Sequence, residues 1–376
     1  MSLGEKHHFR LQRTSDPDKE IQVPLKCNSL RPFFSVLSLV VLAAATPMSG
    51  QSKRTVTKLA DGVYEIRHEP SGNTTVIIGD RQVFVVDTCF LPSQAREDIA
   101  QIRQWTDKPV SFVLNTHFHN DHNIGNRIYM DAFPAVTVIA HVATKREMDI
   151  FGPGSAMREE KGLADEKQML ESGKTQDGKP LSDSDKAQLK DDIPHQTSVV
   201  EELKKIKFQS ATMTFEHDFT IDIGNREVQV KFLGRGNTGG DAVVYLPKEK
   251  IVIAGDLVVW PLPYMYDGYA SEWIQTLQNL AQLDAETIVP GHGRVLHDKT
   301  YVYLLQDFIR SAVDQMTEKL RQTRPAVFQT LDEVKGGVNL EPFRQRFAGD
   351  DKDIAAAFDE AATGLVKIVF EEASLR

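Results

Sequence analysis

The sequence predicts a mixed α/β protein in which two strand-rich halves flank a charged helical insertion. Short apolar runs of strand length recur on both sides of residues 152–210, which are charged and polar. Helical spacing of apolar residues then appears in 300–322 and 352–373. The chain has 376 residues, of which 41% are hydrophobic and 26% charged, the balance of a soluble globular protein. This composition excludes wholesale disorder and a polytopic membrane protein.

Charge and cysteine content exclude further classes of protein. The 44 basic and 53 acidic residues give a net charge of −9, which argues against general nucleic-acid binding because that needs a basic face. Cys27 and Cys89 are the only cysteines, too few for a disulfide scaffold or a thiolate zinc finger.

The N-terminal segment has the pattern of a leader. Residues 1–31 are polar and irregular, and we expect them to be disordered or spurious. The uncharged run Phe33–Ala45 follows basic residues and ends in three alanines, as in a secretory signal, and at 13 residues it is shorter than a membrane span. We therefore expect a signal peptide at 32–50 and a periplasmic or secreted protein without integral membrane association after processing. Cleavage near Ala45 would remove Cys27 and leave Cys89 unpaired.

The first strand-rich half begins with a predicted hairpin. Two apolar runs separated by a Gly79–Asp80 turn predict this hairpin. A helix is predicted over Ser93–Trp105, because the apolar residues of that segment fall on one face. The strands predicted in this half are Asn73–Ile78, Val83–Asp87, Val110–Leu114 and Val136–Ala140.

The insertion at 152–210 contains two helix-like stretches interrupted by glycine and proline. We interpret it as a solvated helical decoration, and the alternative is a lid that shapes substrate access. The second half adds an amphipathic helix over Trp273–Leu283 and a C-terminal helical extension at 299–376. Its predicted strands are Phe219–Ile223, Val228–Leu233, Ala242–Leu246, Ile251–Ala254 and Thr287–Val289.

Four potential metal ligands fall within six residues directly after the strand at 110–114: His117, His119, Asp121 and His122. Imidazole nitrogen and carboxylate oxygen suit a borderline divalent ion such as Zn²⁺. A loop at a strand end lets alternate side chains point into one cleft. The pattern therefore predicts a metal site rather than a chance cluster of polar loop residues.

Two later strands are predicted to end in further ligand-type side chains. Asp256 follows Ile251–Ala254, and His292 follows Thr287–Val289 within a Pro-Gly-His-Gly sequence. The neighbouring glycines would let the backbone pass close to a metal. Either signal is weak alone, but beside the histidine cluster both residues become candidate ligands.

With these motifs the chain resembles the metallo-β-lactamase-fold superfamily. The resemblance covers about 60–298 and also rests on Gly239–Asp241, and we place the corresponding domain at 55–298. It implies an αββα sandwich with one or two zinc ions at the edge between its sheets. It also implies the ligands by position: His117 and His119 for the first metal, Asp121, His122 and His292 for the second, and Asp256 as a bridge or second-metal ligand.

Asn237 departs from the family pattern, which usually carries a third first-metal histidine in a Gly-x-Gly-His-Thr type of loop. A neutral amide is a poor zinc ligand, so the second site is expected to be more complete than the first. Three alternatives follow. Asn237 binds through its carbonyl oxygen, it hydrogen-bonds a metal-bound water, or another histidine replaces it, His141 being the best placed.

The predicted site favours a zinc-dependent hydrolase that uses a metal-bound hydroxide to attack a carbonyl. A bound divalent metal lowers the pKa of water from about 15.7 to about 7, and Asp121 can orient the nucleophile. The expected substrate is a small molecule, a cyclic amide, ester or lactone, with β-lactamase-like chemistry. The alternatives are a glyoxalase-type thioesterase and, third, a non-catalytic metal-binding protein. The sequence does not indicate an oligomeric state.

An aromatic and proline-rich segment at 260–266 follows Asp256. We take Trp260 and Tyr264 as candidate substrate-binding residues, since such a segment beside the metals could form a wall of an apolar pocket. The alternative is that these side chains pack under the C-terminal helices. Cys89 is expected to be a small buried hydrophobe rather than a nucleophile.

Overall fold

The structure is a computed structural model that describes residues 54–69, 71–322 and 330–374. The predicted leader, the signal peptide at 32–50 and Cys27 lie outside the described residues. Within the described part, no helix is both long and apolar enough to cross a membrane.

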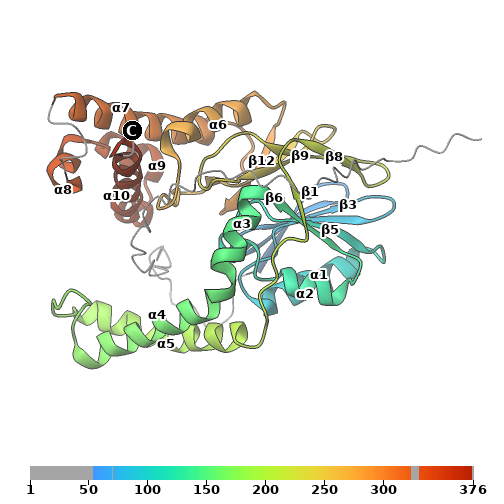
Figure 1. The fold of residues 1–376 in the computed structure, drawn as a ribbon, viewed down its shortest axis with the longest axis horizontal. Coiled ribbons are helices and arrows are strands. Elements are labelled where there is room, and N and C mark those ends of the chain that lie inside the picture. Colours follow the sequence, from blue (N-terminus) through green and yellow to red (C-terminus); the bar gives the residue numbers. More distant parts are fainter. Residues whose placement is uncertain (1–53, 70, 323–329, 375–376) are drawn as a thin grey trace, which may run out of the picture. The chain divides into compact units, whose positions relative to one another are not determined.

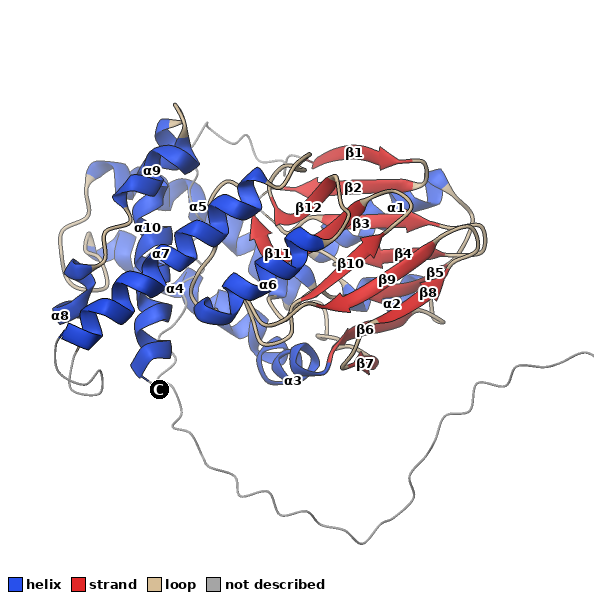
Figure 2. Cartoon of the chain, turned by 90° about the horizontal axis from the view of Figure 1, so that it is seen from above, coloured by secondary structure: helices blue, strands red, loops and turns tan. Residues whose placement is uncertain are grey.

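The described strands form two β-sheets (Figures 1 and 2). One has seven strands in the order β1 to β7, and the other has five in the order β12-β11-β10-β9-β8. The first sheet contains β1 (Arg54–Ala60), β2 (Val63–His68), β3 (Thr74–Ile78), β4 (Val83–Val86), β5 (Val110–Leu114), β6 (Thr137–His141) and β7 (Met213–Phe215). The second contains β8 (Phe219–Asp222), β9 (Glu227–Phe232), β10 (Ala242–Leu246), β11 (Ile251–Val259) and β12 (Thr287–His292).

Alternation along the strands divides the core into layers. In β4, Val83 and Val85 face one apolar cluster, whereas Phe84 and Val86 face another, because successive side chains of a strand point to opposite faces. The cluster with Phe84 also contains Val230 and residues of β10 and β11, so it lies between the two sheets. A strand buried on both faces is a continuous apolar run, as β4 is.

Helices cover the outer face of each sheet. Residues of α1 (Pro92–Trp105) and α2 (Asn126–Ala132) join the cluster on the outer face of the first sheet. Residues of α6 (Ala270–Gln282), α7 (Thr300–Gln322) and α10 (Lys352–Ser374) pack with β10 and β11 of the second sheet (Figure 1). The fold is therefore an αββα sandwich. The remaining helices are α3 (Val142–Phe151), α4 (Ser155–Ser172), α5 (Asp183–Leu203), α8 (Leu331–Val334) and α9 (Glu341–Ala348), with short 3₁₀ turns at Asn120–His122, Gly152–Gly154 and Lys335–Gly337.

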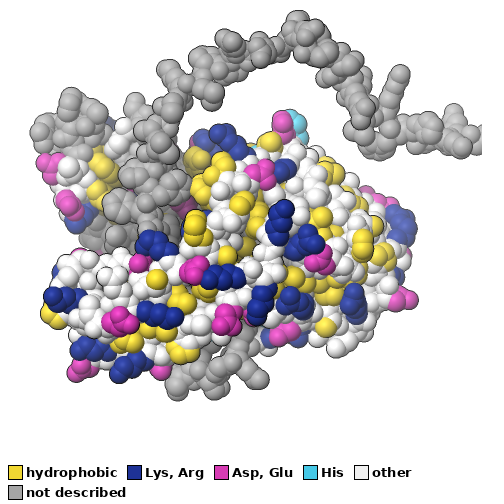
Figure 3. Space-filling view, turned by 60° about the horizontal axis from the view of Figure 1, so that its bottom comes forward, with side chains coloured by type: hydrophobic (Ala, Val, Ile, Leu, Met, Phe, Trp, Pro, Cys, Tyr) yellow, Lys and Arg dark blue, Asp and Glu magenta, His cyan; other side chains and the backbone are white. Residues whose placement is uncertain are grey.

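Within the insertion, α4 and α5 pair with each other. Its base is attached to the core, because Glu202 accepts hydrogen bonds from the Ser93 backbone N–H and hydroxyl, both at 2.9 Å. Val199 and Leu203 also pack on Ile124, just beyond the predicted ligand cluster. The space-filling view shows basic and acidic side chains interspersed over the face that it draws (Figure 3).

The structure corrects the predicted end of one strand. Ile251–Ala254 was expected to stop before Asp256, but β11 continues to Val259 and carries Asp256 inside it. The reason is a bulge, since the pairing of β11 with β12 shifts on both sides of Gly255, which has a φ of +53°. The strand β12 likewise runs on to His292 instead of ending at Val289.

Candidate metal centre

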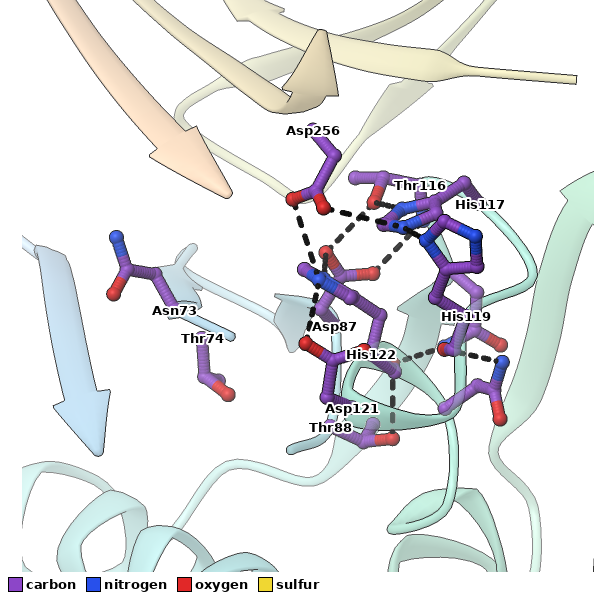
Figure 4. A network of polar contacts seen from close by, with 12 residues as sticks. Asn73, Thr74, Asp87, Thr88, Thr116, His117, His119, Asp121, His122 and Asp256 are labelled. Atoms are coloured by element: carbon purple, nitrogen blue, oxygen red, sulfur yellow. Dashed lines mark hydrogen bonds and ion pairs between the residues drawn. The ribbon is translucent and has the colours of Figure 1, made fainter. Parts of the chain in front are cut away.

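The predicted ligand cluster lies on the loop and 3₁₀ turn that follow β5 (Figure 4). Asp87, at the end of β4, holds this loop by accepting hydrogen bonds from the Thr116 backbone N–H and hydroxyl, both at 2.8 Å. Its carboxylate also lies 2.9 Å from His122 Nδ1. Because Nδ1 is engaged there, the other ring nitrogen of His122 faces away from Asp87 and toward the centre.

His117, His119 and Asp256 form the first donor group, in which one possible ligand atom of each residue lies within 4.8 Å of the others. His117 Nε2 is 2.9 Å from His119 Nδ1 and 3.6 Å from Asp256. The Nε2 atom of His119 is in turn 3.4 Å from the Asp267 carboxylate. Asp267 therefore orients the His119 ring and leaves Nδ1 for a metal.

Asp121, His122 and His292 form the second donor group by the same distance criterion of 4.8 Å. The Asp121 carboxylate is 2.9 Å from His292 Nε2 and 3.4 Å from His122 Nε2, and the two imidazole nitrogens are 3.2 Å apart. The structure thus brings together the three residues that the sequence assigned to the second metal.

Asp256 belongs to the first donor group and also contacts the second, through His122 (Figure 4). One of its oxygens is 3.6 Å from His117 Nε2, and the other is 3.3 Å from His122 Nε2 and 3.7 Å from His292 Nε2. A Cβ on Gly291 would stand 1.9 Å from Asp256 Oδ1, so only glycine allows this approach. One carboxylate is therefore placed to contact metals in both groups.

Contacts between the two sheets position His292. The Asn73 side-chain amide, at the start of β3, donates to the carbonyls of Pro290 and Gly293 at 3.0 and 2.9 Å. The Asn73 backbone N–H donates to the Gly291 carbonyl at 2.7 Å. These bonds hold the end of β12 against the first sheet. They therefore place His292 beside His122, although the two residues are 170 positions apart in the sequence.

The electrostatics match a site built for cations. Burial would lower the pKa of His122, but the carboxylates of Asp121, Asp256 and Asp87 outweigh it and raise that pKa well above its usual value. Burial would raise the pKa of Asp121, but His122 and His292 outweigh it and lower that pKa well below its usual range. Burial and the neighbouring imidazoles hold the pKa of His117 well below its usual value. Its neutral ring is the form that binds a metal.

Asn237 is fully buried, and neither its amide nitrogen nor its amide oxygen has a hydrogen-bond partner among the described residues. Its loop borders the ligand cluster, because the Ala242 N–H donates to the Thr116 carbonyl at 2.8 Å. Buried polar atoms are rarely left unpaired in proteins, so this amide is suited to a partner other than protein.

His141 does not join either donor group. Its ring stacks on Phe232 with centroids 4.2 Å apart, and its Nδ1 accepts the Ala143 N–H at the start of α3. It caps a helix and therefore does not replace the missing third histidine of the first group.

The two candidate substrate-binding residues differ in position. The Tyr264 ring meets the edge of the His119 ring with centroids 5.7 Å apart, so it lies beside the first donor group. Trp260 packs against the C-terminal apolar cluster, and Arg294 lies over its ring at 4.7 Å. Its surroundings match the alternative in which this segment packs under the C-terminal helices.

Sequence reasoning missed three acidic residues at the site. Asp87 was seen only as a strand end, although a carboxylate directly after a buried strand is a usable signal. Asp267 and Glu147 gave no signal, because they come from a loop and from α3, far along the chain from His119. Burial raises the pKa of Glu147 to about 7, and Glu147 and Asp267 act on each other electrostatically.

The donor set fits a pair of divalent metal ions. Zinc–nitrogen bonds of about 2.0–2.1 Å in a tetrahedron place neighbouring donor atoms about 3.3 Å apart. The distances are 2.9–3.4 Å inside the second group, and 2.9 and 3.6 Å from His117 to His119 and Asp256 in the first, on either side of that spacing. Four imidazoles and two carboxylates supply the donors.

The family model of the metallo-beta-lactamase superfamily matches residues 69–292 of this chain. The chain belongs to the metallo-beta-lactamase superfamily. It is thus an enzyme chain of the metallo-hydrolase type. The matched segment begins one residue after β2 and ends at His292, so it contains all six residues of the two donor groups.

Similar proteins differ in the activities that their names state. A linear primary-alkylsulfatase of Pseudomonas sp. (strain ATCC 19151) is 24% identical over 278 residues, which cover 68% of this chain and 45% of that protein. A metallo-beta-lactamase type 2 of Bacillus sp. (strain 170) is 30% identical over 108 residues, 27% of this chain and 42% of that protein. The chain therefore matches less than half the length of these relatives. A solved metallo-beta-lactamase from Pontibacter korlensis is 19% identical, with a TM-score of 0.49 over 69% of this chain and 99% of that one.

In this chain, we expect Asp87→Asn to lower the metal affinity of the second donor group about 10- to 100-fold. The amide keeps the size of the side chain and tolerates the φ of +60° at this position, but it loses the charge that orients His122. Competition with a chromogenic chelator measures the affinity. Asp80→Asn, in the exposed turn after β3, is the matched control. An Asp87→Asn protein with unchanged affinity would show that Asp87 only supports the loop.

Proposed function

We propose that the protein is an exported, zinc-dependent hydrolase of small neutral carbonyl compounds, namely a cyclic amide, ester or lactone. This proposal rests on one observation. Asp256 contacts imidazoles of both donor groups, and the charged side chains around these groups are acidic rather than basic. Two zinc ions in these groups, when bound, would supply an activated water and polarise the bond to be broken.

The charges around the site favour a neutral substrate. In the described part of the chain, every ion pair of the six donor residues joins an imidazole to a carboxylate, and none involves lysine or arginine. Asp267 and Glu147 add two more acidic groups near His119. An anionic group on the substrate would have only the metal ions to offset this repulsion.

The residues of the site have distinct roles in the proposed hydrolysis. Asp121 reaches both imidazoles of the second group, and its side chain is 31% exposed whereas that of His122 is fully buried. It is therefore the carboxylate best placed to hold and orient a water molecule. Tyr264, with its ring against His119, is placed to contact a substrate bound at the first group. Asp87 and Asp267 keep the rings of His122 and His119 oriented.

A sulfate ester is the second candidate substrate. The match to the alkylsulfatase extends over 68% of this chain, whereas the match to the metallo-beta-lactamase type 2 covers 27%. The water that attacks a carbonyl can equally be directed at sulfur or carbon of a sulfate ester by the same metal-binding residues.

Hydrolysis of a substrate panel tests the proposal. The zinc-reconstituted protein is assayed on a chromogenic cephalosporin, an acyl lactone, an acyl thioester and a linear alkyl sulfate, each with and without chelator. We expect chelator-sensitive turnover of the lactone, a neutral carbonyl compound. Turnover of the cephalosporin, which carries a carboxylate, would keep carbonyl hydrolysis but contradict the preference for a neutral substrate. Turnover confined to the alkyl sulfate would establish the second candidate, and turnover of the thioester alone the glyoxalase-type alternative. No turnover by protein shown to hold zinc would support a non-catalytic metal-binding role.

The proposed export rests on the sequence of residues 32–50. N-terminal sequencing of the protein from the native host's periplasm or medium should give a start between Thr46 and Gln51. Protein in the cytosol with an intact Met1 would overturn this part of the proposal.

A further inference from the structure

A third group of potential metal ligands lies outside the metal centre. His68, Cys89 and Asp98 each offer one ligand atom within 4.8 Å of the others, and the side chains are completely buried. His68 Nε2 is 2.7 Å from one Asp98 oxygen, and the Cys89 thiol donates to the other at 3.2 Å. The three residues come from the end of β2, the turn after β4 and helix α1.

Two buried polar atoms, one on His68 and one on Tyr129, have no hydrogen-bond partner among the described residues. The hydroxyl of Tyr129, on α2, is fully buried and has no hydrogen-bond partner among the described residues, and the same holds for His68 Nδ1. Burial is the main cause that raises the pKa of Tyr129 well above its usual value, and the charges of Asp98 and Cys89 add to it. A buried hydroxyl without a partner is uncommon and is often explained by an ion or water.

We propose that His68, Cys89 and Asp98 bind a structural divalent metal ion that prefers thiolate ligands, such as Zn²⁺. Thiolate, imidazole and carboxylate are the three ligand types of protein zinc sites, and a thiolate favours zinc over calcium or magnesium. On binding, the thiol proton and the proton shared between His68 and Asp98 pass to solvent, and metal–ligand bonds replace the two hydrogen bonds. The Tyr129 hydroxyl is available as a further partner. With all three ligand side chains buried, the site is closed, as structural zinc sites are.

Such an ion would connect the metal centre to the first sheet. Asp87, which orients His122, and Cys89 both have positive φ angles, +60° and +67°. Residues other than glycine adopt this conformation only where surrounding contacts hold it. A metal bound to Cys89 would fix the turn from both β2 and α1, and with it the carboxylate of Asp87.

Cobalt substitution tests the proposal, because only a thiolate gives Co²⁺ an intense charge-transfer band in the near ultraviolet. The six donors of the metal centre contain no sulfur, so cobalt bound there contributes only weak visible bands. The full-length chain carrying Cys27→Ser is produced in minimal medium with Co²⁺, since a buried site must be filled during folding. We expect a charge-transfer band, and its loss together with one equivalent of cobalt when Cys89→Ser is added.

Protein that holds cobalt but shows no charge-transfer band would overturn the proposal, whatever the behaviour of the variants. If Cys89→Ser does not fold, His68→Gln keeps the thiol and removes the imidazole, and it should shift or weaken the band. An unshifted band in that variant would exclude His68 as a ligand and overturn the three-residue site. Tyr303→Phe, at an exposed position on α7, is the control substitution, and it should leave the charge-transfer band unchanged.

Discussion

Replacing Asp256 by asparagine is expected to lower kcat/KM by about 10³-fold or more, which corresponds to about 4 kcal/mol of lost transition-state stabilisation. Among the six donor residues, Asp256 is the only carboxylate that forms ion pairs with imidazoles of both groups in the described structure. Asparagine keeps the shape and removes the charge, so both groups should lose metal affinity while the fold is kept. Turnover on the best substrate of the panel and zinc content by chelator competition are the measurements.

The control for this variant is Asp284→Asn, an exposed carboxylate 3.6 Å from Lys250 and away from the donor groups. It should retain full turnover. An Asp256→Asn protein that binds two zinc ions and keeps more than about a tenth of its activity would contradict a bridging role. Asp256 would then act as a ligand to one ion at most.

The ligand cluster was predictable because its spacing is local. His117, His119, Asp121 and His122 lie in one short loop, and a loop after a buried strand has few ways to place them. His292 was also found, because a Gly-His-Gly sequence after a strand is a recognisable context. The sequence patterns likewise predicted most strands of both sheets, since buried strands are nearly continuous apolar runs.

What the sequence did not predict depends on contacts between distant segments. The bulge at Gly255, which turns Asp256 toward both groups, results from pairing with β12 and leaves no local pattern. No individual strand was predicted for β1, β2 or β7. Strand β1 is partly exposed along its length and β7 has only three residues, whereas the region of β2 was predicted only as strand-rich. Helix α3 has an exposed apolar residue, Ile150, and no clean apolar face, so periodicity did not reveal it.

Asn237 stands where the superfamily usually carries a histidine ligand of the first metal. Asn237→His is expected to raise the metal affinity of the first donor group at least about 10-fold, the lower end of what tuning a ligand shell achieves. The side chain is fully buried with both amide atoms unpartnered, and its loop is rigid because Asp241 accepts the N–H groups of Gly236 and Thr238 at 3.0 and 2.8 Å. An imidazole held by that loop would supply the third nitrogen that the first group lacks.

Two controls separate the possible roles of Asn237. Asn225→His adds a histidine in an exposed turn and should leave affinity unchanged, whereas Asn237→Ala removes the amide without adding a ligand. If the Asn237 oxygen already binds the metal, Asn237→Ala should weaken binding. If the amide instead holds a water molecule, Asn237→Ala should retain metal and lose turnover, and Asn237→His should bind metal more tightly and turn over more slowly. Unchanged affinity in both Asn237 variants would mean that this loop does not contact the first metal. The first group would then have His117, His119 and Asp256 as its protein ligands.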